Sequence, residues 1–224
     1  MTHTVHPFAH RLGIIRDWQS RWFAKTPGVY RENVKIDTAI RVFLKKRLRG
    51  LYVTAVEIER GEKVIRIRIK TSRPGMVIGR GGEGSTKLTK EITTVVRALG
   101  IKEIPAIRID IEEIRSPESQ AAIVAYMVAE SLEKRQTFRR VLKQTVEKVM
   151  ANRDVQGVRI GVSGRLGGAE MSRQEEIKRG RVPLQTLRAD IDFAREIAYL
   201  PYGVIGIKVW IYRGDIFEDE SGQA

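Results

Sequence analysis

The chain has 224 residues, with 41 Lys and Arg against 27 Asp and Glu, and its formal charge at neutral pH is +14. This surplus favours a polyanionic partner such as nucleic acid or an acidic membrane surface. The sequence contains no cysteine, which excludes disulfides, thiolate zinc sites and cysteine nucleophiles. No apolar run approaches the roughly 18–20 residues that span a bilayer, and no secretory signal is evident, so we expect a cytoplasmic protein without a membrane partner.

The first 36 residues are interrupted by proline and glycine, yet they contain Trp18, Trp22 and Phe23. Aromatic residues at this density indicate a segment that packs on a domain or a partner, and we predict an N-terminal extension over residues 1–36. All three histidines also lie here, but Pro7 interrupts any helix that would align them, so we expect no metal site. They are His3, His6 and His10.

The region that follows alternates helix-like and strand-like patterns. From Asp37, an expected N-cap, apolar residues recur at helical spacing until Gly50. Strands are predicted over residues 53–59 and 64–70, joined by a hairpin-sized link. In the second strand isoleucines alternate with basic residues, which is typical of a half-buried strand.

A second helical turn is predicted at Pro74, before the apolar residues 76–78. A glycine loop comes next, then a helix over residues 83–98 and a third strand over 104–111. The order helix, strand, strand, helix, glycine loop, helix, strand defines a predicted domain over residues 37–115.

The glycine loop has the pattern G-x-x-G with a basic residue inside it. Glycines let a phosphodiester backbone approach the main chain closely. Amides at the start of the next helix face the phosphates and favour negative charge. We therefore interpret this loop as an RNA-binding element in which the arginine contacts phosphate. Its residues are Gly79, Arg80, Gly81 and Gly82.

Two alternatives remain for this loop. Gly79, Gly81 and Gly84 also satisfy the dinucleotide fingerprint, and Glu103 lies about 20 residues on, where an acid would bind ribose. That fingerprint must directly follow a buried parallel strand, and only a short apolar stretch precedes this loop. A purely structural turn is the other alternative. We favour RNA and expect no cofactor and no small-molecule substrate.

A second predicted domain spans residues 116–214. Ser116, Pro117 and Glu118 are expected to open one helix, and Thr137 to cap another over residues 138–150. The remainder is strand-like, which predicts two helices on a mainly antiparallel sheet. The expected strands cover residues 155–163, 169–181, 187–199 and 204–212. Residues 215–224 are predicted to be a disordered acidic tail.

The helix after Thr137 carries a basic face. With its apolar stripe inward, Arg139, Arg140 and Lys143 are separated by three and four residues and share the exposed side. A solvated helix face is the ordinary interpretation. Acidic residues are sparse, however, because only Glu133 and Glu147 flank the cluster, and this favours contact with a polyanion.

The second predicted domain also contains a glycine-rich turn at residues 163–170, where Arg165 could make a phosphate contact or the segment could simply be a tight turn. The following strands add further basic residues, and Asp190 and Asp192 among them suggest ion pairs. We find no nucleophile–base pairing, so an enzyme is not expected. The further basic candidates are Arg179, Arg181 and Arg188.

The order of elements in the first domain resembles that of the type II KH domain. The whole chain resembles the bacterial S-three family of small ribosomal subunit proteins, and this resemblance implies an α+β fold of two domains. Departing from the family's usual Gly-Lys-Lys-Gly, the loop here has a single basic residue. The matching segments are residues 5–7, 11–14, 73–79, 163–170, 180–184, 186–192 and 202–211.

The resemblance implies a structural protein of the small-subunit head, located on ribosomes in the cytoplasm. It would bind small-subunit rRNA and contact mRNA where it enters the ribosome, assisting the unwinding of structured mRNA. Arg139, Arg140 and Lys143 match the positions tied to mRNA, and Arg11 joins the basic residues above as a further RNA contact. The implied protein neighbours are S-ten and S-fourteen. A free KH-type RNA regulator remains an alternative.

Overall fold

The structure is a computed structural model that describes residues 5–61, 64–99 and 105–217. The chain forms two compact units, one of residues Trp18–Arg115 and one that combines Met1–Asp17 with Ser116–Ala224. Both units combine helices and a four-stranded sheet, which confirms the α+β class. Residues 1–36 do not form a separate extension. The residues up to Asp17 belong to one unit and those from Trp18 onward belong to the other.

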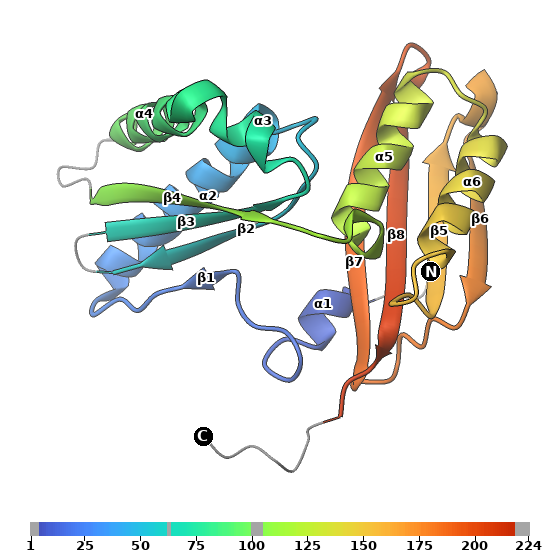
Figure 1. The fold of residues 1–224 in the computed structure, drawn as a ribbon, viewed down its shortest axis with the longest axis horizontal. Helices are drawn as coiled ribbons and strands as arrows, with labels where there is room; N and C mark the ends of the chain where they lie inside the picture. The colour runs from blue at the N-terminus through green and yellow to red at the C-terminus, as the bar shows by residue number, and fades with distance from the viewer. Residues whose placement is uncertain (1–4, 62–63, 100–104, 218–224) are drawn as a thin grey trace. The chain divides into compact units, whose positions relative to one another are not determined.

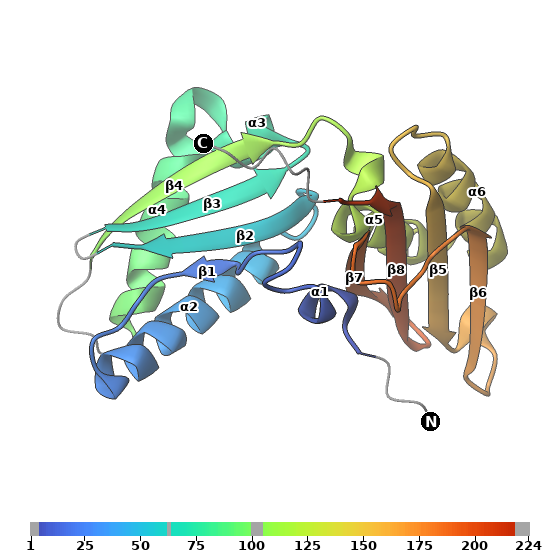
Figure 2. The same cartoon turned by 90° about the horizontal axis from the view of Figure 1, so that it is seen from below.

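In the first unit the sheet has the strand order β1-β2-β3-β4 (Figure 2). β2 and β3 form an antiparallel hairpin, while β4 lies parallel to β3 and β1 lies parallel to β2. Its elements are β1 (Ser20–Arg21), α2 (Pro27–Arg47), β2 (Val53–Arg60), β3 (Val64–Thr71), α3 (Pro74–Ile78), the 3-10 turn η1 (Arg80–Gly82), α4 (Glu83–Arg97) and β4 (Ala106–Glu113).

Helix α2 begins earlier than the sequence pattern predicted. The Thr26 hydroxyl accepts the N–H of Val29, and Pro27 occupies the first turn. Asp37 is therefore no N-cap but a buried residue inside the helix. Its carboxylate accepts the indole N–H of Trp22 at 2.8 Å and pairs with Arg60 at 3.1 Å. The bond from Trp22 ties the aromatic-rich segment to α2, and the pair with Arg60 ties α2 to β2.

The core of the first unit lies between the sheet and two helices. Ile65, Ile67 and Ile69 of β3 are fully buried, as their alternation predicted. They pack with Ile40 of α2 and Ile92 of α4 in one apolar cluster. The helices thus cover one face of the sheet, and this arrangement fixes where the glycine loop ahead of α4 stands.

The second unit is an antiparallel sheet in the order β6-β5-β8-β7. Helices α5 and α6 cover one face of it (Figure 1), where their apolar residues share a single cluster with those of the strands. Its elements are α1 (Pro7–His10), the 3-10 turn η2 (Pro117–Ser119), α5 (Ala121–Glu133), α6 (Phe138–Met150), β5 (Gly157–Gly164), the 3-10 turn η3 (Leu166–Gly168), β6 (Arg173–Gly180), β7 (Ala189–Leu200) and β8 (Gly203–Asp215).

One helix start in this unit differs from the prediction, whereas α6 has the predicted bounds. Pro117 opens the short turn η2, and α5 begins only at Ala121, whose N–H donates to the carboxylate of Asp192 at 2.8 Å. A β7 side chain thus caps α5 from a distance in sequence. At α6, Thr137 occupies the N-cap position but its hydroxyl forms no capping hydrogen bond.

The tail was predicted to begin at residue 215, and this start is wrong because residue 215 still belongs to the sheet. Asp215 is the last residue of β8 and pairs with Ala189, and the N–H of Ile216 donates to the carbonyl of Arg188. The remaining predicted tail, residues 218–224, lies outside the described residues.

The face of the second sheet opposite α5 and α6 is covered in part by the N-terminal segment. Trp210 and Tyr212 of β8 are buried there in a small apolar cluster that Phe193 of β7 joins. Helix α1 contacts β7, and the His6 ring stands edge-on to Phe193 with their centroids 4.8 Å apart. The segment before Asp17 is therefore an integral part of this unit.

Candidate nucleic-acid interface

The glycine loop connects helix α3 to helix α4. Gly79, Gly81 and Gly82 have φ values of 73°, 62° and 83°, a left-handed region that residues with a Cβ rarely adopt. The loop therefore requires glycine for its shape. Arg80, at the start of η1, is exposed and forms no ion pair with any residue that the structure describes.

Gly84 explains the apparent dinucleotide fingerprint without a nucleotide. A Cβ at Gly84 would lie 2.6 Å from the carbonyl oxygen of Val77 and 2.7 Å from that of Ile78, so glycine lets α4 pack closely on α3. The element before the loop is a helix, whereas the fingerprint requires a strand. The dinucleotide alternative is therefore wrong. Glu103 lies outside the described residues.

The start of α4 can face an anion. Gly82 is its N-cap residue in a left-handed conformation, and no side chain caps the first turn. The N–H of Glu83 donates to the carbonyl of Arg80, and the helix dipole favours negative charge at this end. The Ser85 hydroxyl donates to the Gly82 carbonyl at 2.8 Å. A phosphate beside Arg80 would meet both its charge and the positive end of this dipole.

A groove of about 490 Å³ lies along α4, from Ser85 near the start of the helix to Arg97 near its end, with Ile109 of β4 on its other side. Its α4 side is rich in hydroxyl residues, whose hydroxyls donate to carbonyls one turn back, as Thr89 does to Ser85 and Thr93 does to Thr89. They therefore present methyl groups and acceptor lone pairs to the groove. The residues that line it are Ser85, Thr86, Thr89, Lys90, Thr93, Thr94, Arg97 and Ile109.

This groove was not predicted from the sequence. The signal was present, because Thr86, Lys90 and Thr94 repeat at a spacing of four and Arg97 follows, which places them along one helix face. What the sequence could not supply was the neighbouring strand, since β4 closes the groove only through its parallel pairing with β3. Lys90 and Arg97 add positive charge to its polar side.

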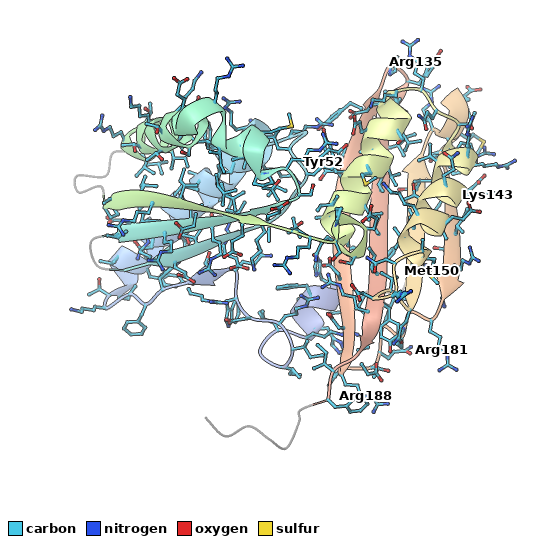
Figure 3. The ribbon with its side chains drawn as sticks, viewed as in Figure 1. Tyr52, Arg135, Lys143, Met150, Arg181 and Arg188 are labelled. Atoms are coloured by element: carbon cyan, nitrogen blue, oxygen red, sulfur yellow. The ribbon has the colours of Figure 1, made fainter. Side chains whose placement is uncertain are left out.

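The basic face of α6 is arranged as predicted. Val141, Leu142, Val146 and Val149 are buried, which leaves the basic residues exposed on the other side of the helix. Lys143 projects outward from α6 in Figure 3. Neither Arg140 nor Lys143 forms an ion pair with any described residue. The exposed set is Arg139, Arg140 and Lys143.

Arg139 has a partner that the sequence did not reveal. Glu175 of the neighbouring strand β6 approaches its guanidinium at 3.5 Å, and Glu175 also lies 3.6 Å from Arg173. The Arg139 side chain is nevertheless 71% exposed. An exposed pair of this kind contributes at most about 1 kcal/mol, so a polyanion can displace it.

The glycine-rich turn at residues 163–170 is stabilised by its own arginine. Arg165 donates from Nε to the carbonyl of Ala169 at 2.9 Å and from Nη1 to that of Tyr202 at 3.1 Å. Gly167 and Gly168 have φ values of 70° and 81°, so the segment is a tight turn whether or not Arg165 also contacts phosphate. Arg165 remains exposed, with donors left for a phosphate.

The other predicted basic candidates lie on the surface of the second unit. Arg179 and Arg181 are exposed and have no ion pair among the described residues. Arg188 is 61% exposed and donates to Asp215 at 2.9 Å. In Figure 3, Arg181 and Arg188 lie at the opposite end of this sheet from Arg135, which follows α5. They do not adjoin the α6 face.

Arg11 is not a surface residue, and its prediction as an RNA contact is wrong. The side chain is 0% exposed and its donors are directed at main-chain carbonyls. Burial lowers its pKa, against which nearby Asp190 acts. Arg11 therefore holds the N-terminal segment to the second unit. The accepting carbonyls belong to Pro7, Pro183, Leu184, Thr186 and Ala189.

The predicted ion pairs of Asp190 and Asp192 are confirmed. Arg16 pairs with Asp190 at 2.5 Å, and Arg213 pairs with Asp192 at 3.0 Å. Within the described part of the chain, no cluster of histidine and carboxylate residues could hold a metal ion. His3 lies outside that part. No helix there is both long and apolar enough to span a membrane.

A glycine loop between two helices, with a groove beside it and the strand and helix order of the first unit, defines a KH-class RNA-binding protein. Comparison with known families agrees. The model of the KH domain matches residues 39–119, and that of the ribosomal protein S3 C-terminal domain matches residues 128–211.

Curated relatives match over nearly the whole length. The chain is 45% identical to small ribosomal subunit protein uS3 of Nitrosococcus oceani over 223 residues, covering 100% of this chain and 96% of the relative. It is 46% identical to uS3 of Endomicrobium trichonymphae over 220 residues, covering 97% and 90%. For uS3 of Clostridium novyi the identity is 44% over 216 residues, covering 96% and 94%.

The chain belongs to the family of small ribosomal subunit protein uS3. This confirms the resemblance identified from the sequence. Because the proteins of this family are structural components of the ribosome, the chain is a ribosomal RNA-binding protein and not an enzyme.

Proposed function

We propose that the chain is a structural constituent of the small-subunit head that binds rRNA and also contacts mRNA where the message enters the ribosome. Its neighbours there are S-ten and S-fourteen. The observation that carries the mRNA assignment is the α6 face, where Arg140 and Lys143 are exposed beside Arg139 without a carboxylate partner of their own among the described residues. Cations left uncompensated on a rigid helix attract phosphates.

The α6 face acts on mRNA without a nucleotide site of its own. Its three cations hold phosphates of an extended strand, which favours the single strand over a compact duplex. The energy for strand opening then comes from translocation of the ribosome. The face assists unwinding by biasing the opened state, and it contacts any message because phosphate contacts carry no sequence information.

The rRNA contacts are assigned to two other places. In the first unit, Arg80 and the positive end of the α4 dipole hold phosphate at the glycine loop, and the groove along α4 accepts unstacked bases. In the second unit, the exposed basic residues add backbone contacts. They are Arg165, Arg179, Arg181 and Arg188.

A triple variant tests the α6 assignment. In Arg139→Ala/Arg140→Ala/Lys143→Ala, the salt slope of single-strand binding should fall by about two, because each lost contact removes about 0.7. Small subunits assembled with this variant should unwind structured messages more slowly than subunits with the wild-type chain. Unwinding at the wild-type rate would refute the assignment.

A matched control separates position from charge. Lys35→Ala/Lys45→Ala/Lys46→Ala removes the same charge from exposed positions of α2 in the first unit. We expect this control to leave unwinding unchanged. An equal loss in both variants would show that only net charge matters, and the α6 face would then have no special role.

A further inference from the structure

The described residues cover only part of the face of the second sheet opposite α5 and α6. The described part of the N-terminal segment contacts this face at the row of Phe193 and Trp210. In the next row, Gly161 of β5 pairs with Lys208 of β8, and Lys208 pairs with Arg195 of β7. Lys208 and Arg195 are both exposed. This row therefore begins an open sheet face.

Three cations border this face without compensation. Lys178 of β6 pairs in register with Arg159 and so lies on the same side as Lys208 and Arg195. None of the three forms an ion pair with any residue in the described ranges. The one acid of the row, Glu176, is already bound by Arg159 at 2.6 Å. The net charge of the face is thus positive.

Gly161 is not required by the fold. Its φ is not positive, β5 pairs with both neighbours without a bulge, and a Cβ there would meet no atom closer than 3.8 Å. Glycine inside a strand weakens it by about 0.5–1 kcal/mol relative to alanine. Gly161 is nevertheless buried, so its backbone is not open to a ligand and it is no part of the exposed face.

Exposed side chains for stacking lie two rows further along. Tyr199 of β7 is 60% exposed and alternates onto the same side as Arg195, with Ile197 between them at 44%. An aromatic ring next to cations on a sheet is a platform on which unpaired bases stack. Lysine is depleted at the centre of protein–protein interfaces, so the lysines of this face favour RNA over a protein partner.

We propose that this open sheet face, defined by Lys178, Arg195, Tyr199 and Lys208, binds a single strand of RNA. The strand places its phosphates at the three cations and a base on Tyr199. The site deepens the proposed function, on which it rests, by adding an RNA contact that is separate from both the glycine loop and the α6 face.

The test measures the full chain binding a fluorescein-labelled oligouridine across a salt series. Lys178→Ala/Arg195→Ala/Lys208→Ala should lower the salt slope by about two. Tyr199→Ala should weaken binding severalfold without changing the slope. Melting temperatures establish that every variant is folded.

Photocrosslinking of the oligouridine gives an independent readout, since Tyr199 should appear in a crosslinked peptide. One outcome is that the triple variant of Lys178, Arg195 and Lys208 binds like wild type while the triple variant of the α6 face shows a lower salt slope. In that case RNA binding by the open sheet face is refuted and the proposed function stands. If neither variant changes binding, both are refuted. Normal RNA binding combined with failure to join small subunits would indicate a protein partner and would also overturn the proposal.

Discussion

The Nε–H of Arg11 donates to the carbonyl of Ala189 at 2.6 Å, a bond between residues 178 positions apart. Arg11→Met would remove it and leave carbonyls of the segment before Ala189 without this donor. Each buried acceptor left unpaired costs about 1–3 kcal/mol. We expect the second unit to lose at least about 3 kcal/mol, measured as hydrogen exchange of β7 and β8.

The control for Arg11 is Arg179→Met, which removes a surface cation of the same unit. Its stability should change by less than about 0.5 kcal/mol. The two variants should also differ in RNA binding: Arg179→Met lowers the salt slope, whereas folded Arg11→Met does not. A lower slope for Arg11→Met would restore Arg11 as an RNA contact.

Asp37→Asn tests the buried pair in the first unit. The substitution leaves the guanidinium of Arg60 without its carboxylate while preserving the size of the side chain. Loss of one partner of a buried pair costs about 3–5 kcal/mol. Urea unfolding followed by circular dichroism should report this loss. In Trp22→Phe, which removes only the indole donor, the loss should be nearer 1 kcal/mol; equal losses would contradict the ranking.

Gly84→Ala should separate α3 from α4. The added Cβ meets the carbonyls of Val77 and Ile78, and overpacking of this kind costs about 1–3 kcal/mol. Hydrogen exchange of α4 should rise, and RNA binding through the glycine loop should weaken. Gly28→Ala is the matched control because α2 has room there and gains helix propensity. Unchanged exchange in Gly84→Ala would show that the close approach is not needed.

Glu175→Gln should strengthen single-strand binding at the α6 face severalfold, because it releases Arg139 from its carboxylate partner. Glu147→Gln on α6 changes the net charge equally but has no ion pair to release among the described residues. Binding titrations at low salt compare the two. If both variants gain affinity equally, the pair of Arg139 with Glu175 does not restrain RNA binding.

The N-terminal segment should respond to pH through His6. Its Nδ1 accepts the N–H of Phe8 at 3.2 Å as the N-cap of α1, and only an unprotonated Nδ1 can accept. Burial, and secondarily Arg195, lower the pKa of His6 below its ordinary value of 6.5. Between this lowered pKa and 6.5, the folded state therefore binds fewer protons than the unfolded state.

It follows that His6 contributes stability above about pH 6.5, and this contribution is lost as the pH falls through the lowered pKa. The melting temperature of the second unit should decline on acidification across this range. His6→Asn keeps a capping acceptor that does not titrate, so its decline should be shallower. Parallel curves for the two proteins would exclude His6 as the responsible group.

Much of the fold could be predicted because its signals are local. The alternation of Ile65, Ile67 and Ile69 fixed the buried face of β3, and the stripe of α6 fixed which side its basic residues occupy. The start of α2 was missed although Thr26 and Pro27 carry a capping signal, since the next residue, Gly28, is more typical of a loop.

The site residues that sequence reasoning misjudged depend on distant partners. A basic residue contacts RNA or main-chain carbonyls according to what surrounds it, and all the carbonyls that accept from Arg11 except that of Pro7 lie 172–178 positions away. Glu175 reaches Arg139 only through the packing of β6 beside α6. Such relations between charges require the tertiary arrangement.

The docking of residues before Asp17 onto β7 also has a consequence for biosynthesis. These residues are synthesised well before the carbonyl of Ala189, which accepts from Arg11 and lies 178 positions further along the chain. The unit from Trp18 to Arg115 can complete its sheet while synthesis continues. The segment before Asp17 must wait, unattached, until Ala189 has emerged, so a product truncated before that residue would leave it without its anchorage.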